Sequence, residues 1–461
     1  MTRQIRALIS TGGLLFALFA GVPSLAQKSG GVLHVHALDS PPSLSMHEEV
    51  DAVPARAMMG VFNHLVVFDQ HIKQNSMQSI VPDLATGWSW SEDGTELTFP
   101  LREGIKWHDG RPFTAKDVKC TWDLLTGKSR EKLRLKPRKS WYGNLEEVTA
   151  DGDHEVTFHF RRPQPAFLAL LASAFSVVYP CHVPPAEMRR HPIGTGPFKF
   201  VEFKPNEYIK VTRNTDYWKK DRPYLDGFES TIVRNPSTAT LAFISGKFDM
   251  TFPGNLTPPL LKDVASQLPQ AICELNSGSI NRHVIVNRDV PPFDSPELRQ
   301  AMALTLDRKA FIEIVSDGQG EIGGVLQPQP GGLWGMPPDM LKELPGYDPD
   351  VAKNRAQARQ LMEKLGYGPA KRLAIKVSAR NLATYRDPAV ILIDQLKEVY
   401  IDGELEAIDT TSYFPKLRRK EFTAVSTSRP ADQTPTRPWI CFMGAARTST
   451  GTATATRKST S

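Results

Sequence analysis

The stretch from Val81 to Trp122, VPDLATGWSWSEDGTELTFPLREGIKWHDGRPFTAKDVKCTW, decides the fold. Apolar residues alternate from Leu97 to Leu101, directly after a turn at Asp93-Gly94. This pattern predicts a β-hairpin with one buried face. The stretch therefore indicates the edge of a sheet and not a catalytic centre.

A helix should follow this hairpin. Thr114 is placed to cap it, and Asp117 stands where the reciprocal capping residue belongs. Val118, Trp122 and Leu125 then recur at helical spacing, which predicts an apolar face turned toward the sheet. Strand, turn and capped helix together form one structural module.

The amino terminus predicts export. Arg3 and Arg6 precede an apolar stretch from Leu14 to Val22, and Ser24-Leu25-Ala26 has small residues at the two positions that a signal peptidase reads. We expect cleavage after Ala26, because the apolar stretch is too short to span a bilayer. No cysteine follows this point directly, so a free periplasmic protein is favoured over a lipid-anchored one.

Charge and composition exclude several classes of protein. The chain has 461 residues, is 40% hydrophobic and carries a formal charge of +6. The excess lies in the leader and after residue 423, so the body from Gln27 to Thr423 is formally neutral. A nucleic-acid footprint and a polybasic membrane patch are therefore not supported. The length predicts two or three lobes.

The cysteines and histidines predict no metal site. Cysteines stand at positions 120, 181, 273 and 441, without the close pairs that metal sites use. A disulfide is compatible with the periplasm, but its pairing stays open. His34 and His36 share a strand face, whereas His154 and His159 fall on a second hairpin. Neither pair has a carboxylate or thiol pattern for a metal, and no cofactor is expected.

The module at 81–122 resembles the signature of the extracellular solute-binding proteins of family 5, the peptide receptors of ABC importers. The matching segments are P-x-L-A, a D-G hairpin, L-R-x-G-x-x-x-H-D-G-x-P and T-A-x-D-V. Three later segments also resemble the family, namely GTGPF at 194–198, RNTDYW at 213–218 and NRDVPPFDSPELRQAMALTLDR at 287–308. In the last of these, Ser295 or Asp294 should cap a helix and a second helix should start near Asp307.

The resemblance implies a periplasmic binding protein of type II, an α/β fold with two α/β lobes and a small inserted α+β lobe. The first lobe would comprise 27–65 and 191–280, the inserted lobe 66–190, and the third lobe 281–423. From Asp348 onward the pattern supports this fold independently. A helix from Asp348 to Gly366, a strand at 373–377, a helix beginning at Asp387-Pro388 and a strand at 405–408 predict a parallel βαβ unit.

No catalytic set is present in the sequence, which lacks G-x-S-x-G and H-E-x-x-H motifs. The resemblance implies a monomeric binding protein that captures a peptide or a related small solute between its lobes and delivers it to membrane permease subunits. A secreted hydrolase is the alternative. The ligand stays open, because relatives take peptides, nickel chelates, opines, glutathione, haem or sugars on the same scaffold.

Family position and loop character indicate the substrate-binding residues. They are Ser43 in the loop 39–45, Gly194, Thr195 and Gly196 in the passage between lobes, Asn281, and Trp334 in the proline- and glycine-rich loop 327–338.

The chain loses its hydrophobic pattern after residue 423 and ends in TSTGTATATRKSTS. A flexible low-complexity tail is one interpretation. A frameshift is the favoured one, because reading two bases later allows 450–454 to encode the family's G-Y-C-N and 433–436 its D-P-D. We therefore expect the closing carboxy-terminal crossover, and an acidic residue that would hold the ligand's α-amino group, to be missing. Such a receptor would fold poorly and bind defectively.

Overall fold

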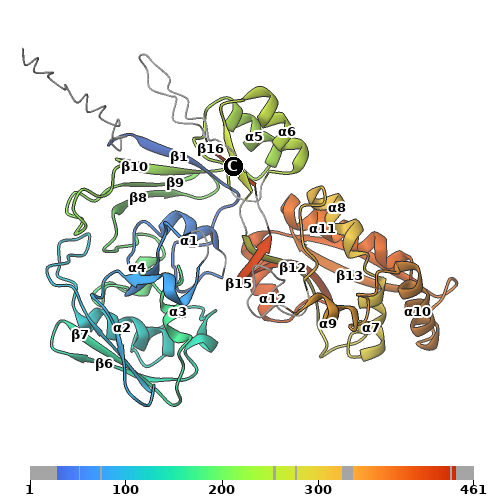
Figure 1. The fold of residues 1–461 in the computed structure, drawn as a ribbon, viewed down its shortest axis with the longest axis horizontal. Helices are drawn as coiled ribbons and strands as arrows, with labels where there is room; N and C mark the ends of the chain where they lie inside the picture. Colours follow the sequence, from blue (N-terminus) through green and yellow to red (C-terminus); the bar gives the residue numbers. More distant parts are fainter. Residues whose placement is uncertain are drawn as a thin grey trace, which may run out of the picture.

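The computed structural model describes residues 29–50, 52–72, 75–252, 256–275, 278–323, 336–436 and 439–442. The predicted leader and Trp334 lie outside these residues. The described chain forms three lobes, with the third lobe on the right of Figure 1 and the other two stacked on its left.

Two separated parts of the chain build the sheet of the first lobe. β1 (Val32–Ala37) runs parallel to β10 (Gly227–Ile232), and β9 (Tyr208–Arg213) and β8 (Phe198–Lys204) follow in antiparallel pairs. The other elements of this lobe are α1 (Ala52–Met58), α5 (Pro236–Ile244), α6 (Pro258–Gln267), β11 (Ile272–Leu275) and β16 (Trp439–Phe442). Buried residues of α1 and β9, including Met58, Ile209 and Val211, share one core.

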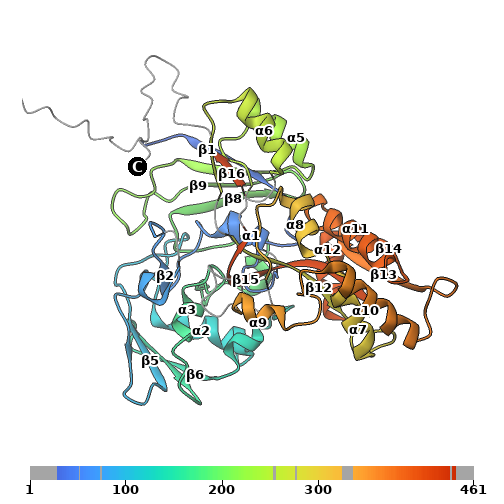
Figure 2. The ribbon, with the colours of Figure 1, turned by 45° about the vertical axis from the view of Figure 1, so that its right-hand side comes forward.

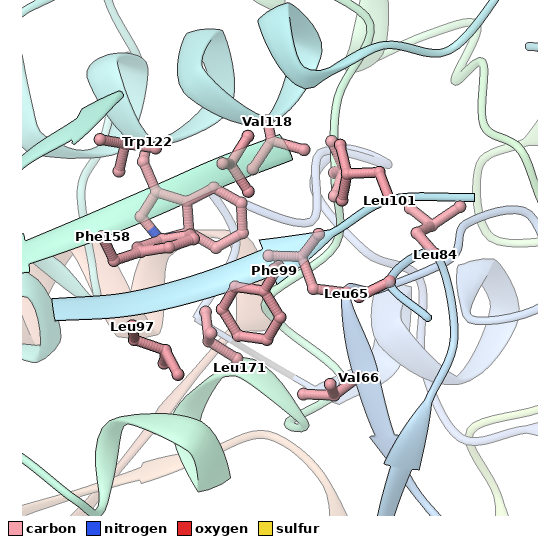
Figure 3. Close-up of a cluster of buried hydrophobic side chains, with 14 of the residues drawn as sticks. Leu65, Val66, Leu84, Leu97, Phe99, Leu101, Val118, Trp122, Phe158 and Leu171 are labelled. Atoms are coloured by element: carbon pink, nitrogen blue, oxygen red, sulfur yellow. The ribbon is translucent and has the colours of Figure 1, made fainter. Parts of the chain in front are cut away.

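The inserted lobe contains the hairpin and the capped helix that the sequence predicts. Its sheet has the order β4 (Ser89–Trp90), β5 (Glu96–Pro100), β7 (Glu155–Phe160), β6 (Leu145–Asp151), all antiparallel. α2 (Ala115–Thr126) begins with the predicted capping box of Thr114 and Asp117. Trp122 packs edge-on against Phe158 with ring centroids 5.0 Å apart, and Phe99 contacts the same ring (Figure 3). This cluster is the core of the lobe.

Several shorter elements complete the inserted lobe, and most of them contribute residues to its core. They are β2 (Val66–Phe68), β3 (Ile80–Pro82), α3 (Phe167–Leu171), α4 (Pro185–Met188) and the 3-10 turns η1 (Met77–Ser79) and η2 (Lys139–Tyr142). Cys120 of α2 forms a disulfide with Cys181. The sequence alone did not predict which cysteines pair.

The third lobe is an α/β layer structure. Its sheet has the order β12 (Gly278–Val286), β15 (Ala424–Thr436), β13 (Leu373–Arg380), β14 (Ile401–Ile408). Its helices are α7 (Pro296–Thr305), α8 (Arg308–Ser316), α9 (Pro338–Lys342), α10 (Val351–Lys364), α11 (Ala383–Lys397) and α12 (Thr410–Arg418). Ser295 caps α7 and Asp307 caps α8, as predicted. β13, α11 and β14 form the predicted parallel βαβ unit.

The start of α11 differs from the prediction, because the helix begins at Ala383 and contains Pro388. Proline has no N–H, so it cannot bond the carbonyl of Thr384 one turn earlier. The guanidinium of Arg282 donates to that carbonyl instead. A side chain from β12 thus satisfies the helix interior, and the sequence around Pro388 carries no sign of it.

The segment after residue 423 also differs from the expected tail. Ala424–Thr436 forms β15, which pairs antiparallel with β12 and parallel with β13, and Trp439–Phe442 forms β16 beside β11. The register against β12 shifts between Ser279 and Ile280, whose partners are Pro435 and Pro430. The two prolines therefore lie at an irregularity, where lost ladder bonds cost least. Backbone from this segment occupies the middle of the third-lobe sheet, so regular structure does not end at residue 423.

Candidate functional site

Two neighbouring cavities lie where the three lobes meet. The larger has a volume of about 500 Å³ and the smaller about 260 Å³. Val50 of the first lobe, and Phe414 and Arg418 of α12, line both. The larger cavity is further lined by Pro137, Ile285, Val286, Asn287, Arg288, Asp289, Leu417, Lys420 and Phe422. The smaller is further lined by Pro42, Glu49, Arg134, Leu135, Thr410, Thr411 and Pro415. Figures 1 and 2 both place α12 on the side of the third lobe that faces the other lobes.

The first wall of the cavities is the loop after β1, which makes several buried polar contacts. Arg189 donates to the fully buried carboxylate of Glu48 at 2.6 Å. Arg138, itself buried, donates to the carbonyls of Met46 and Glu49 at 3.2 and 2.9 Å. The hydroxyl of Tyr179 accepts from the backbone N–H of Met46 at 2.8 Å. Because these partners belong to the inserted lobe and the passage out of it, the loop joins that lobe to the first.

Glu49 is the acidic group of this wall. Its Oε1 accepts from the hydroxyl of Ser43 at 2.6 Å and from the guanidinium of Arg134 at 3.2 Å. Arg134 comes from the inserted lobe and lies half exposed at the cavity edge. The carboxylate of Glu49 is thus already satisfied by groups of the protein.

A buried ionic cluster connects the first lobe to the third. Asp39, which is fully buried, accepts from Arg380 at 3.0 Å and from Arg234 at 2.8 Å. The hydroxyl of Thr410, the first residue of α12, also donates to Asp39. Arg380 ends β13 and is almost completely buried. The cluster therefore fixes the start of α12, and with it the helix that lines both cavities.

The second wall is α12 and the end of β12. Asp409 caps α12 by accepting from the N–H of Thr411 at 3.0 Å. Phe414 and Leu417 give this wall apolar surface, and Ile285 of β12 adds more. Lys420 forms an ion pair with Asp289, and both residues line the larger cavity. Burial lowers the pKa of Arg418, while the nearby Glu49 carboxylate opposes that shift.

The structure brings together only some of the predicted binding residues. Ser43 is buried beside the smaller cavity through its bond to Glu49. The backbone of Asn281 lies in β12, but its side chain and Trp334 fall outside the described residues. Among the predicted residues that the structure describes, none lines either cavity, so contact of the predicted residues with a ligand stays a prediction.

The Gly194–Gly196 segment has a packing role in the structure. The N–H of Gly196 donates to the carbonyl of Val61 at 2.9 Å, and a Cβ on Gly194 would lie 1.8 Å from that oxygen. Thr195 donates to Asn63 at 3.1 Å. Glycine is required at positions 194 and 196 because two backbone segments touch there.

Sequence reasoning missed Phe414, Leu417 and Arg418 as cavity residues. The D-T-T start at Asp409 is a capping signal that could have located α12. Its position beside the loop 39–50 depends on the Asp39 cluster, which joins residues 341 and 371 positions apart in sequence. No local pattern encodes such contacts.

The model of the bacterial extracellular solute-binding proteins, family 5 Middle, matches residues 79–449. The chain belongs to this family. The match extends past residue 423, after which the sequence loses its hydrophobic pattern. Within the described residues no helix is both long and apolar enough to cross a bilayer, and no three histidine, cysteine or acidic side chains gather as metal ligands would.

Comparisons with individual proteins support the same family assignment. The chain is similar to the periplasmic murein peptide-binding protein MppA of Escherichia coli, at 28% identity over 91% of this chain and 79% of that protein. It is also similar to di/tripeptide-binding protein 2 of Pseudomonas aeruginosa, at 28% identity over 65% of this chain and 58% of that protein. The fold resembles the solved structure of DppA from Helicobacter pylori with the peptide STSA, with a TM-score of 0.76, 22% identity and coverage of 88% and 79%. These likenesses confirm the type II binding-protein fold.

Proposed function

We propose that this solute-binding protein captures a short peptide in the two cavities between its lobes and delivers it to the permease of an ABC importer in the inner membrane. The proposal is supported mainly by the position of the cavities where the three lobes meet. Loop 39–50, residues 134–137 and α12 come from three lobes and enclose about 500 and 260 Å³, which suits a small ligand. Closure of the lobes on the ligand would then select the bound state.

The relatives support peptides as the ligand class, because MppA and the di/tripeptide-binding protein carry peptide names. The glutathione-binding protein GsiB from Pectobacterium atrosepticum is similar over 89% of this chain at 26% identity. Because glutathione is itself a small peptide, this relative also supports a peptide ligand. A periplasmic location and a monomeric state belong to the same proposal. Neither the family nor these relatives support the secreted hydrolase.

A thermal-shift screen of the mature chain tests the proposal, with short peptides, oligosaccharides and metal chelates as separate groups. A ligand present at 100 times its dissociation constant should stabilise the protein by about 2.7 kcal/mol. We expect peptides to raise the melting temperature, and mass spectrometry should then recover them unchanged after long incubation. Stabilisation by sugars or chelates alone would refute the peptide assignment, and cleaved peptides would refute the binding assignment.

A further inference from the structure

The loop that joins α2 to η2 is strongly basic. Residues 128–139, KSREKLRLKPRK, contain seven lysines and arginines against one glutamate, a formal charge of +6. We expected no polybasic patch, because the body from Gln27 to Thr423 is formally neutral. That neutrality is an average over the body, whereas the local potential depends on how the charges are distributed. The loop therefore corrects the expectation.

Three residues anchor this loop to the rest of the protein. Leu133 is buried in the core of the inserted lobe. The backbone N–H of Arg134 donates to the buried carboxylate of Glu48. Arg138 is buried, and its guanidinium lies 3.5 Å from the centroid of the Phe175 ring. Two of the seven cations, Arg134 and Arg138, are thus used within the protein.

The other five cations of the loop have no carboxylate partner. They are Lys128, Arg130, Lys132, Lys136 and Lys139, and none forms an ion pair in the described part of the chain. Lys128 and Lys132 donate only to backbone carbonyls. Glu131, the one carboxylate within the loop, pairs with none of them. All five except Lys136 are exposed, so the loop presents an uncompensated positive surface to solvent.

The side chains of the loop indicate what kind of anion fits this surface. The loop contains no aromatic residue, and its apolar residues are buried or face the cavities. A specific protein partner is usually held by aromatic anchors, and a single-stranded nucleic acid by rings on which its bases stack. A partner with dense and evenly spread negative charge fits better. The head groups of anionic lipids have this distribution.

We propose that the loop 128–139 is an interaction surface for the anionic lipid head groups of a membrane. The attraction comes from the five unpaired cations and acts over about 10 Å at about 0.1 M salt. Because Leu135 and Pro137 of the same loop line the cavities, this contact would bring the cavities close to the membrane that holds the permease. The inference goes beyond the proposed function, since it requires no ligand.

Co-sedimentation with lipid vesicles tests the inference on the mature chain, beginning at Gln27, which lacks the apolar leader. One set of vesicles is phosphatidylcholine alone, and the other contains equal parts of phosphatidylcholine and phosphatidylglycerol. The loop variant combines Arg130→Gln, Lys132→Gln, Lys136→Gln and Lys139→Gln.

The matched control removes the same amount of charge elsewhere. It combines substitutions at four exposed lysines outside the loop that form no ion pair in the residues described, namely Lys106→Gln, Lys247→Gln, Lys262→Gln and Lys309→Gln. The basic residues after position 423 are common to all three chains. The melting temperature of each variant shows that it is folded.

We expect the native chain and the control to bind the anionic vesicles and not the neutral ones, with binding lost at about 0.5 M salt because the charges are screened. The loop variant should bind the anionic vesicles roughly tenfold more weakly or less, because each basic residue near the surface adds to the attraction. Equal binding by the loop variant, or equal binding of the native chain to neutral vesicles, would overturn the inference.

Two further outcomes separate this inference from its neighbours. If the native chain binds soluble polyglutamate but not the anionic vesicles, the surface fits an acidic protein and the lipid assignment is wrong. If no peptide stabilises the chain in the thermal-shift screen while the loop-dependent vesicle binding is present, the proposed function fails and this inference stands.

Discussion

At the scale of single residues, Asp39 links the first lobe to the third. It receives bonds from Arg234, Arg380 and Thr410, and so ties the loop after β1 to β13 and α12. The negative charge of the buried Asp39 carboxylate compensates the positive charge of the buried Arg380 guanidinium, whose burial without a partner would cost free energy. Its role links stability to function, because α12 carries Phe414 and Arg418.

Asp39→Asn should therefore destabilise the chain by about 3–5 kcal/mol, the cost of leaving one partner of a buried ion pair uncompensated. Chemical denaturation measures this change. The control is Arg234→Gln, because the side chain of Arg234 is 44% exposed and should contribute about 0–1 kcal/mol. Equal effects of the two substitutions would contradict the role given to Arg380.

His47 makes stability depend on pH. It is buried against the ring of Tyr179, and burial, followed by the charge of Arg138, lowers its pKa to about 3 from the ordinary 6.5. The buried backbone contact to Val177 and the neighbouring His64 are the other groups that act on it. The unfolded chain binds the extra proton below pH 6.5, so stability falls as the pH falls from 6.5 toward 3.

His47→Phe removes this titration and keeps a ring against Tyr179. Between pH 7 and pH 5 the native chain should lose about 2 kcal/mol more unfolding free energy than this variant, at about 1.4 kcal/mol per pH unit. Denaturation midpoints at both pH values give the comparison, with the exposed His71→Phe as control. A variant that keeps the full acid sensitivity would show that other groups are responsible.

At the scale of elements, Gly194–Phe198 joins β8 to the chain at Gly60 and Val61. The N–H of Phe198 donates to the carbonyl of Gly60 at 2.9 Å, and Gly196 does the same to Val61. The N–H of His108 in the inserted lobe donates to the carbonyl of Gly194 at 2.9 Å, and the N–H of Gly194 donates to Nδ1 of His108 at 3.2 Å. The segment thus bonds both to another part of the first lobe and to the inserted lobe.

Gly194→Ala should destabilise by about 1–3 kcal/mol or more, because the new Cβ would overlap the carbonyl of Val61. A lowered melting temperature would show this. Gly87→Ala is the matched control, since a Cβ there meets nothing within 4 Å. If Gly194→Ala has the same melting temperature as the native chain, the close contact with Val61 does not constrain the residue at this position.

Much of the element structure could be predicted from the sequence, because the deciding signals are local. The capping box of Thr114 and Asp117, the cap at Ser295 and the alternation at Leu97–Leu101 each specify an element from adjacent residues. The predicted start of α11 was wrong. The carbonyl of Thr384, which Pro388 cannot bond, accepts a hydrogen bond from Arg282 of another element. The cavities could not be located either, since the contact of Asp39 with α12 appears only in the folded chain.

At the scale of the whole molecule, the fold depends on the segment after residue 423. β15 lies between β12 and β13, so the third-lobe sheet is continuous only when this strand is present. The out-of-frame origin of the segment stays a prediction, but its backbone completes the sheet as the chain stands. Backbone pairing requires only N–H and C=O groups, which any non-proline residue supplies.

Truncation after Thr423 should therefore open the third lobe while the inserted lobe, with its own core, stays folded. Limited proteolysis of the truncated and the 461-residue chains gives the comparison. We expect faster cleavage within 281–423 in the truncated chain and equal resistance within 66–190. A frame-corrected chain that resists proteolysis better than both would support the frameshift, and identical digestion of all three would contradict a structural role for β15.

The central claim is that the ligand lies between the lobes against α12. Titration calorimetry with the peptide that gives the largest thermal shift tests this most directly, on the native chain, Phe414→Ala and Leu241→Ala. Phe414 lines both cavities, whereas Leu241 is 60% exposed on α5 and lines neither. We expect Phe414→Ala to weaken binding at least tenfold, about 1.4 kcal/mol, and Leu241→Ala to leave it unchanged. Native affinity in a folded Phe414→Ala variant would contradict the account.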